Sequence, residues 1–455
     1  MKNKKNRIYI LIVLFLFLTL FIISKSNIFE RNEPIIELEN NIFSNLKEPI
    51  RFKIKDEESG ISYLKITVQK NTNNEIITIK DEKIKNEKEL SLAIELPKLA
   101  FREKVDFYTM QIDVSDNSLW GFFTGNKISK KIKISIDNKR PEVSIISNSY
   151  QIEQGGAAAV VFKANDENLK ELYIQSDDNQ IFKVSPFIKE NYYVALIAWE
   201  ANKPNFRAYI IAKDKANNTT KERIRYYITN KTYKDSKIDL NDDFLDGKIN
   251  DLVEQYSQNK ITNKIEKFKF INETLRTNSE EIIYKLSKNI SEIDFDNFDI
   301  KLFLPLKNSK KVADFADHRC YYYDNKKISC SYHLGMDLAS ILQADIVSSN
   351  DGKVVFAEDN GIYGISVLID HGLGIYSLYA HCSSKFVNEG DNIKAGDMIA
   401  KTGATGLALG DHLHFSVLIQ GIDVRPEQFQ DKKWIKQNII DIFEKAKKII
   451  LSDKI

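Results

Sequence analysis

The sequence Gly410-Asp-His-Leu-His-Phe415 decides the architecture of the last third of the chain. Its alternation predicts a β-strand, in which side chains two residues apart lie on one face, about 6.7 Å from each other. His412 and His414 therefore point to the same side, and Leu413 points to the core. Two half-exposed surface histidines would show the same spacing. The pattern therefore indicates a metal site only if other segments of the chain supply further ligands.

A second motif, His333-Leu-Gly-Met-Asp337, has a histidine and an aspartate four residues apart. A straight strand would separate the two by about 13 Å, too far to share one ion. The backbone must therefore turn between them, and Gly335 can supply the turn because glycine tolerates dihedral angles closed to other residues. Alone, such a pair is more often a surface ion pair than a metal site.

A third element, Leu378-Tyr-Ala-His381, alternates in the same way and predicts that Tyr379 and His381 share one face. All six histidines of the chain lie between His318 and His414. Two imidazoles and one carboxylate from these motifs form a ligand set that suits zinc and leaves a position open for water. Further histidines remain available for proton transfer.

These motifs resemble the LytM/lysostaphin-type zinc metallopeptidases, over about residues 303–429. The resemblance rests on the three histidine motifs and on the lead-in around Phe315 and Arg319, Asp351-Gly-Lys-Val354, Gly361-Ile-Tyr-Gly364, Ile369-Asp-His-Gly372, Gly390-Asp-Asn-Ile-Lys-Ala-Gly396, Gly403-Ala-Thr-Gly406 and Arg425-Pro426. The sequence departs from the family pattern at Ala316-Asp317, Asp411 and Ser416, and none of these departures removes an expected ligand.

The resemblance implies that His333, Asp337 and His414 bind one zinc ion per chain and that His381 and His412 are the catalytic pair. We expect His412 to act as general base and His381 to stabilise the developing oxyanion, with the two roles open to exchange. The implied reaction is hydrolysis of peptide cross-links in cell-wall peptidoglycan by metal-activated water. The alternative is a non-enzymatic binding or activator protein of other wall hydrolases, against which the five retained residues argue.

Two further expectations come from the resemblance. One of Tyr321, Tyr322 and Tyr323 is expected to steady the tetrahedral intermediate, and the sequence leaves open which one. His371 matches a position that is not a ligand in the family, so a structural role is expected for it.

The N-terminus carries a membrane signal. Four basic residues precede an uninterrupted apolar run from Ile8 to Ile23, long enough for a helix to cross most of a bilayer. Ser24, Lys25 and Ser26 provide no small-x-small cleavage site. We therefore expect residues 1–30 to be an uncleaved anchor in the cytoplasmic membrane, with the catalytic domain on the outer, periplasmic side of the cell envelope. The alternatives are a cleaved signal peptide and a buried core helix, and the flanking lysines argue against the core helix.

Composition limits the partners. The 66 Lys and Arg residues nearly balance the 64 Asp and Glu residues, so no basic surface predicts nucleic-acid binding. Three cysteines exclude a disulfide-built fold. In an exported domain Cys320 and Cys330 can close a loop before His333, whereas Cys382 should face away from the histidine that precedes it.

The fold class predicted for the 455 residues is multi-domain and mainly β. Short alternating stretches repeat at about 100 residues, as in Phe52-Lys-x-x-Asp-Glu57 and Phe162-Lys-x-x-Asp-Glu167, and predict two immunoglobulin-like β-sandwich modules. The expected order after the anchor is module 1 at 31–138, module 2 at 139–231, a helical connector at 232–299, the peptidase domain at 300–430 and an amphipathic helix at 431–455. The connector is expected either to space the domains or to cover the cleft as an inhibitory segment.

Overall fold

The structure is a computed structural model that describes residues 2–24, 27–72, 75–100, 103–291, 295 and 298–452. It divides into two compact units. Unit 1 contains residues 1–141, 166–170 and 213–219, and unit 2 contains residues 142–165, 171–212 and 220–455. The six segments predicted from the sequence stay predictions as to their bounds.

Unit 1 begins with helix α1 (Lys2–Ser24), which contains the apolar run Ile8–Ile23 of the predicted anchor. Within the described residues, no helix combines the length and the apolar character that a membrane span requires, so the predicted transmembrane segment is not confirmed. Lys25 and Ser26, on which the expected lack of cleavage depends, lie outside the described residues.

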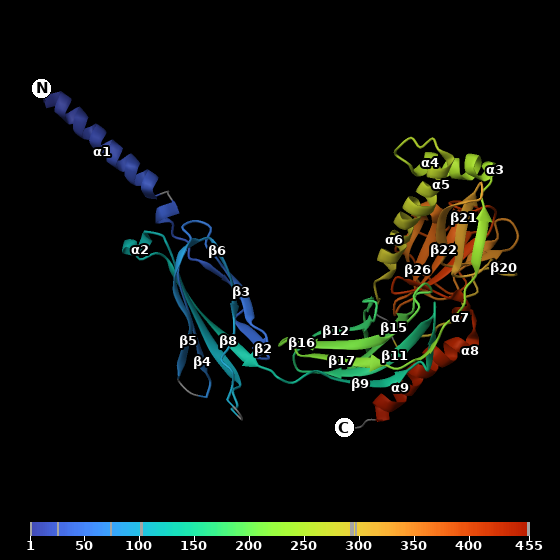
Figure 1. The fold of residues 1–455 in the computed structure, drawn as a ribbon, viewed down its shortest axis with the longest axis horizontal. Helices are drawn as coiled ribbons and strands as arrows, with labels where there is room; N and C mark the ends of the chain where they lie inside the picture. The colour runs from blue at the N-terminus through green and yellow to red at the C-terminus, as the bar shows by residue number, and fades with distance from the viewer. Residues whose placement is uncertain are drawn as a thin grey trace. The chain divides into compact units, whose positions relative to one another are not determined.

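The β-rich part of unit 1 consists of two sheets that enclose one apolar core (Figure 1). The first sheet has the order β1 (Ile35–Glu37), β3 (Ile50–Lys55), β6 (Glu89–Ile94). The second has the order β2 (Asn41–Ser44), β8 (Lys127–Ile136), β7 (Phe107–Asp116), β4 (Ile61–Lys70), β5 (Ile76–Glu87). Two short helical turns, η1 (Asn27–Phe29) and α2 (Trp120–Phe123), lie outside these sheets. We call this part module 1, and its immunoglobulin-like character stays a prediction.

A second set of strands, module 2, has the same two-sheet plan. One sheet has the order β14 (Ser185–Phe187), β15 (Lys189–Ala198), β11 (Ala157–Asn165), β9 (Glu142–Asn148). The other has the order β13 (Ile181–Phe182), β12 (Leu169–Ser176), β16 (Ala208–Asp214), β17 (Thr219–Ile224), and β10 (Gln151–Glu153) pairs with β18 (Tyr227–Thr229).

The C-terminal part of unit 2 is built on an antiparallel sheet of eight strands. Its order is β20 (Lys310–Ala313), β23 (Met336–Ala339), β31 (Leu413–Ile419), β27 (Ile375–Cys382), β26 (Ile365–Asp370), β25 (Gly352–Asp359), β29 (Asn392–Ile393), with β32 (Ile422–Val424) paired to β31. Two smaller sheets flank it. They are β19 (Asp235–Asp239), β21 (Asp317–Tyr323), β22 (Lys326–His333), and β24 (Asp345–Val347), β30 (Met398–Lys401), β28 (Ser384–Lys385).

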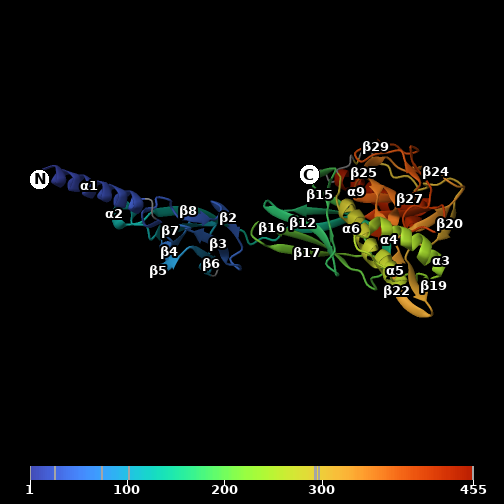
Figure 2. The ribbon, with the colours of Figure 1, turned by 90° about the horizontal axis from the view of Figure 1, so that it is seen from above.

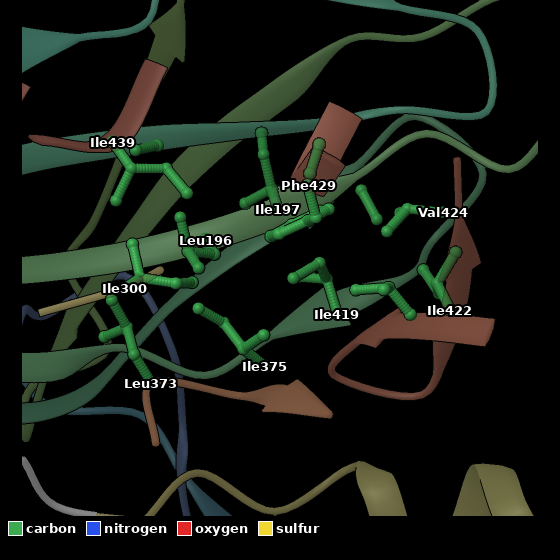
Figure 3. Close-up of a cluster of buried hydrophobic side chains, with 14 of the residues drawn as sticks. Leu196, Ile197, Ile300, Leu373, Ile375, Ile419, Ile422, Val424, Phe429 and Ile439 are labelled. Carbon is green, nitrogen blue, oxygen red and sulfur yellow. The ribbon is translucent and has the colours of Figure 1, made fainter. Parts of the chain in front are cut away.

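Both faces of the eight-stranded sheet are covered by other parts of unit 2. On one face, Ile375 and Ile419 share an apolar core with Leu196 and Ile197 of module 2 and with Phe429 (Figure 3). The opposite face packs against the predicted connector. Module 2 is therefore part of the same packed body as the sheet.

The connector is helical, as predicted, but it begins with a strand. Strand β19 pairs in parallel with β21, a pairing that the sequence did not predict. The helical segments that follow run beside the large sheet (Figure 2). They are α3 (Asp242–Phe244), η2 (Leu245–Ile249), α4 (Asn250–Tyr256), α5 (Lys264–Lys269), η3 (Phe270–Leu275) and α6 (Arg276–Ser287).

The segment predicted as an amphipathic helix, residues 431–455, contains α8 (Lys432–Ile435), η5 (Lys436–Ile440) and α9 (Asp441–Ser452). The short helix α7 (Pro426–Gln430) precedes it. Helix α9 packs against β9 and β11 of module 2 (Figure 1). The ring of Phe443 lies 5.9 Å from that of Phe187. The amphipathic pattern identifies a buried face but not the surface that buries it.

Candidate functional site

Strand register brings the predicted ligands together. Strands β23 and β31 are antiparallel neighbours, and Asp337 lies directly opposite His414. Directly opposed residues have side chains on the same face with Cβ atoms about 4.5–5.5 Å apart. His333 ends strand β22, and the turn after it places its ring beside this pair.

The three side chains converge within hydrogen-bonding distance. His333 Nε2 lies 2.9 Å from Asp337 Oδ1 and 3.0 Å from His414 Nδ1. His414 Nδ1 lies 3.0 Å from the same Asp337 oxygen. All three residues are buried. They form a group whose ligand atoms are close enough to hold one metal ion.

The hydrogen bonds on the outer sides of the two rings fix their tautomers. His333 Nδ1 lies 2.8 Å from the carbonyl oxygen of Asp314, which can only accept, so Nδ1 carries the proton. His414 Nε2 lies 3.1 Å from the Ser416 hydroxyl, and that hydroxyl donates to the Leu334 carbonyl. Nε2 of His414 must then be the donor to the serine oxygen. This assignment follows from the hydrogen-bond network.

Two nitrogen lone pairs and one carboxylate oxygen thus face one another without a proton to share. Burial lowers the pKa of His414 to about 4, which keeps this ring neutral. Burial alone would raise the pKa of Asp337, but its contacts with His333 and His414 outweigh that effect and hold the pKa below the usual value. A cation removes the repulsion among these atoms, so the donor set fits a divalent metal.

The predicted catalytic pair lies beside this group. The rings of His381 and His412 are 4.9 Å apart, and the His381 ring is 5.7 Å from that of His414. Each ring donates from Nδ1 to a backbone carbonyl: His381 to Thr405 and His412 to Gly410, both at 2.8 Å. Both Nε2 atoms therefore carry a lone pair, and that of His412 lies 3.6 Å from Asp337 Oδ1.

His381 does not share a face with Tyr379, so this prediction was wrong. Tyr379 lies opposite Phe415 and packs against it in the core. Its neighbour Ala380 lies opposite His414 on the other face. His381 has a φ of 61°, and this left-handed backbone breaks the alternation and turns the imidazole toward the metal ligands. Such conformations in non-glycine residues are concentrated at functional sites.

Gly335 is required for a different reason than we predicted. Its φ is not among the positive values of the chain, so unusual dihedral freedom is not what the position needs. A Cβ atom at this position would lie 2.5 Å from Ser416 Oγ and 2.6 Å from His414 Nε2. Glycine is needed because the backbone passes directly against the outer side of a ligand.

The group opens into a cleft of about 320 Å³ whose walls come from distant segments. The connector supplies Leu240, Phe244 and Phe268 to one wall, and residues 407–409 also line the cleft. Leu409 is 84% exposed. The connector thus borders the cleft, a position that the predicted inhibitory role requires and that the predicted spacing role does not exclude.

Arg319 and Ser416 are contacts that the sequence did not assign. The Arg319 guanidinium lies 3.9 Å from Asp337 Oδ2. Ser416 is one of the departures from the family pattern, and its hydroxyl orients the His414 ring. Its position two residues after His414 on the same strand was the available signal.

Of the three consecutive tyrosines, only Tyr321 lines the cleft within the part of the chain that the structure describes. Tyr323 bonds to Asp242, and Tyr322 lies under the Lys237 ammonium group. Tyr332 also lines the cleft.

The remaining histidines lie apart from the cluster. His371 bonds to the Asp351 carbonyl at 2.7 Å and to the Ser377 hydroxyl at 2.6 Å. His318 pairs with the exposed Asp235 at 2.7 Å.

The cysteines behave as predicted. Cys320 and Cys330 lie opposite each other on β21 and β22 and form a disulfide. It closes the hairpin that ends at His333. Cys382 is free and buried in the core.

Comparison with known proteins shows which family the region around these residues resembles. Residues 331–426 match the family described as Peptidase family M23. The DD-carboxypeptidase/endopeptidase Mpg of Neisseria meningitidis serogroup B is 38% identical over 94 residues, which cover 21% of this chain and 22% of that protein. The peptidoglycan DD-endopeptidase ShyB of Vibrio cholerae is 36% identical over 88 residues, 19% of this chain and 21% of that protein.

A third relative is named as an activator of hydrolases and not as a peptidase. The murein hydrolase activator NlpD of Salmonella dublin is 36% identical over 97 residues, 21% of this chain and 25% of that protein. The chain thus spans about a fifth to a quarter of the length of these curated relatives.

Proposed function

Residues 331–426 form a domain of peptidase family M23, and from this we propose that the chain is a zinc-dependent endopeptidase that hydrolyses peptide cross-links in cell-wall peptidoglycan. The observation that carries the proposal is the convergence of His333 Nε2, Asp337 Oδ1 and His414 Nδ1 within 3.0 Å of one another. The outer nitrogens of both rings are committed to hydrogen bonds, so only the inward atoms are free to bind.

His333, Asp337 and His414 would hold the zinc ion. Three protein ligands from nitrogen and oxygen, with a fourth position left for water, are the usual set at catalytic zinc sites. The bonds from His333 to Asp314 and from His414 to Ser416 fix the rings, as outer partners do at such sites. When bound, zinc lowers the pKa of its water and polarises the scissile carbonyl.

His412 is the better placed of the two remaining histidines to act as general base. Its free Nε2 can take the proton of the attacking water and pass it to the leaving amine. Its side chain is 16% exposed, so the charged imidazolium keeps some contact with solvent.

His381 is less suited to the oxyanion-stabilising role that we assigned to it. Its Nδ1 proton is used on the Thr405 carbonyl, which leaves Nε2 as an acceptor. Burial, together with the nearby His414 and His412, lowers the pKa of His381 well below its usual value and disfavours a second proton. We therefore assign His381 to orienting the water through Nε2. Tyr321 and Arg319 line the cleft, and each carries a donor that could stabilise the oxyanion.

The bond proposed for cleavage is a peptide bond in the cross-link. The cluster offers one carboxylate, and Asp337 is committed to the metal, whereas glycosidases usually need two carboxylates on either side of the sugar bond. Two relatives, one an endopeptidase and the other a carboxypeptidase/endopeptidase, support the same class of bond. A peptidoglycan substrate would place the working domain in the cell envelope.

The alternative is a non-catalytic activator, and the similarity to the murein hydrolase activator NlpD favours it. An activator needs the fold but neither the metal nor a base. The purified chain acting alone on peptidoglycan distinguishes the two, because only the enzyme releases products without a second hydrolase.

The test is mass spectrometry of muropeptides from purified sacculi incubated with the chain. Cross-linked dimers should become monomers with new free amines and no free lactyl ends. His381→Ala and His412→Ala should each lower the rate about 10²–10⁴-fold while retaining zinc. His318→Ala is the matched control, because this histidine pairs with Asp235 away from the cleft. Release of sugar strands without peptides would exclude the endopeptidase and support an amidase.

Metal content is a separate test of the ligand assignment. His333→Ala, Asp337→Ala and His414→Ala should each lose most of the zinc, because two remaining ligands cannot complete the site. Elemental analysis of the purified variants measures this directly. Full zinc in all three would show that the assignment is wrong.

A further inference from the structure

Module 1 contains three carboxylates that the peptidase chemistry does not use. Glu30 follows η1, Asp56 follows strand β3, and Asp116 is the last residue of β7. Each offers one oxygen, and these oxygens lie within 4.8 Å of one another. The residues are 7%, 7% and 3% exposed, so the group is buried. Helix α2 follows Asp116 in the chain and lies between β7 and β8.

The hydrogen-bond donors to this group are neutral. Asn126 donates from its side chain to Glu30 at 2.7 Å and to Asp116 at 2.8 Å. Backbone N–H groups and the Ser59 hydroxyl supply the others. Within the described residues, no lysine, arginine or histidine forms an ion pair with any of the three carboxylates. Burial and the neighbouring Asp116 raise the pKa of Glu30, as expected where like charges are crowded.

One oxygen of the group has no partner. Asp56 Oδ1 accepts from the backbone N–H groups of Glu58 and Ser59, at 3.0 and 3.2 Å. Asp56 Oδ2 is buried and has no hydrogen-bond partner. Buried polar atoms without partners are rare because they have lost water and gained nothing in exchange. A buried carboxylate oxygen without a partner, next to two further carboxylates, is the arrangement expected of a cation ligand.

The same arrangement occurs a second time. Asp137, Asp166 and Asp214 also offer oxygens within 4.8 Å of one another, and all three belong to unit 1. Asp166 follows β11 as Asp56 follows β3, and both positions lie in the internal repeat of the sequence.

The hydrogen bonding of the two groups is also equivalent. Asn218 donates from its backbone and its side chain to Asp214, both at 2.8 Å. Asn126 does the same to Asp116, again with both distances 2.8 Å. Each asparagine also donates to the backbone carbonyl of the first acidic residue of its group, Glu30 or Asp137. Such repetition is not expected of carboxylates that gather by chance.

We propose that Glu30, Asp56 and Asp116 bind one calcium ion. The ligand set is all oxygen, which suits a hard cation and not zinc. Calcium binds oxygen at 2.3–2.6 Å, so two oxygens on one ion can be up to about 5 Å apart, and the 4.8 Å limit of this group falls within that range. Magnesium usually keeps several of its waters and is held by only one or two carboxylates, whereas this group offers three buried carboxylates.

The first test measures calcium bound to the metal-stripped full chain by equilibrium dialysis with radioactive calcium. Asp56→Asn is the variant of choice, because an amide keeps an oxygen for the bonds from Glu58 and Ser59 and replaces the unpartnered oxygen. Wild type should bind one ion per chain more than Asp56→Asn. Ions at the Asp137 group cancel in this difference. The matched control is Glu57→Gln, an exposed carboxylate next in sequence, which should bind as wild type does. Equal binding by wild type and Asp56→Asn would overturn the proposal.

Thermal unfolding distinguishes two roles for Asp56, a calcium ligand or a carboxylate that only stabilises the fold. About 2 mM calcium is several-fold above the dissociation constant of a typical extracellular site. At this concentration the melting temperature of module 1 should rise by about 5 °C in wild type and should not rise in Asp56→Asn. Without calcium, Asp56→Asn should melt at or above the wild-type temperature, because a buried negative charge has been removed. Melting of Asp56→Asn well below wild type in calcium-free buffer would overturn the proposal, because the carboxylate would then be structural. Neither measurement depends on peptidase activity.

Discussion

The close approach of Gly335 to His414 gives the sharpest test of how the metal ligand is held. In Gly335→Ala the new methyl group would lie 2.5 Å from Ser416 Oγ and 2.6 Å from His414 Nε2, whereas ordinary contacts begin at 3.4 Å. The serine and the imidazole would each have to retreat by nearly 1 Å. Because the β31 backbone holds both residues, the movement must come from their side chains and break the bond between His414 and Ser416.

The expected cost has two parts. Loss of an outer partner of a zinc-bound histidine typically lowers metal affinity 10–100-fold. A misplacement of about 1 Å at a catalytic site can lower the rate about 10²-fold. We therefore expect Gly335→Ala to bind zinc 10–100-fold more weakly and, when saturated with zinc, to turn over about 10²-fold more slowly. The fold should survive because the atoms nearest to the new methyl group belong to side chains and not to the backbone.

Zinc affinity is measured by competition with a chromophoric chelator, and turnover by release of monomeric muropeptides at saturating zinc. Ser416→Ala removes the same hydrogen bond without the added methyl group, so it should reproduce the loss of affinity and spare more of the rate. Gly247→Ala is the matched control, because a Cβ there meets nothing within 4 Å. Wild-type affinity and turnover in Gly335→Ala would refute this reasoning.

Two further predictions concern stability. Replacing Cys320 and Cys330 by serine opens a loop with a sequence separation of 10, so the free energy of unfolding should fall by about 2–3 kcal/mol. The measurement is the urea midpoint, which should be lower than in wild type. An unchanged midpoint would contradict the view that the disulfide stabilises the protein by restricting the unfolded chain. Burial lowers the pKa of His371 to about 4, so its imidazole is neutral in both states above pH ~6.5, and below that pH only the unfolded chain gains the proton. Stability should therefore fall between about pH 6.5 and 4, by at most about 3 kcal/mol from this residue, and His371→Gln should show a smaller fall than wild type in urea titrations at the two pH values.

The spacing of residues along the sequence predicted which side chains could lie on one face of a strand. The pairing of strands in the folded sheet decided which of them lie close together. Spacing alone placed His412 and His414 on one face of a strand, and both line the cleft. The pairing of Asp337 with His414 depends on β23 lying beside β31, and nothing in either segment specifies that neighbour. The resemblance to a known family, not the periodicity, supplied the ligand set.

The predictions that failed did so where one residue or one distant surface overrides a regular pattern. The left-handed backbone of His381 reverses the face on which its ring lies, and alternation cannot foresee a positive φ at a non-glycine residue. Strand β19 was missed because its sequence, Asp-Ser-Lys-Ile-Asp, carries charges at alternate positions. Such charges are common on edge strands, where one side faces solvent.

The packing of unit 2 also changes how module 2 should be understood. Strand β31 carries His414 near its start and Ile419 at its end, and Ile419 is buried against Leu196 of module 2 and against Phe429 (Figure 3). A chain cut at residue 232 would keep every ligand but expose this apolar surface to water, at a cost of about 25 cal/mol for each Å² uncovered. Beyond any contact that it makes with the cell wall, module 2 therefore has a role inside the molecule. It fixes the far end of the strand whose near end positions the metal ligand.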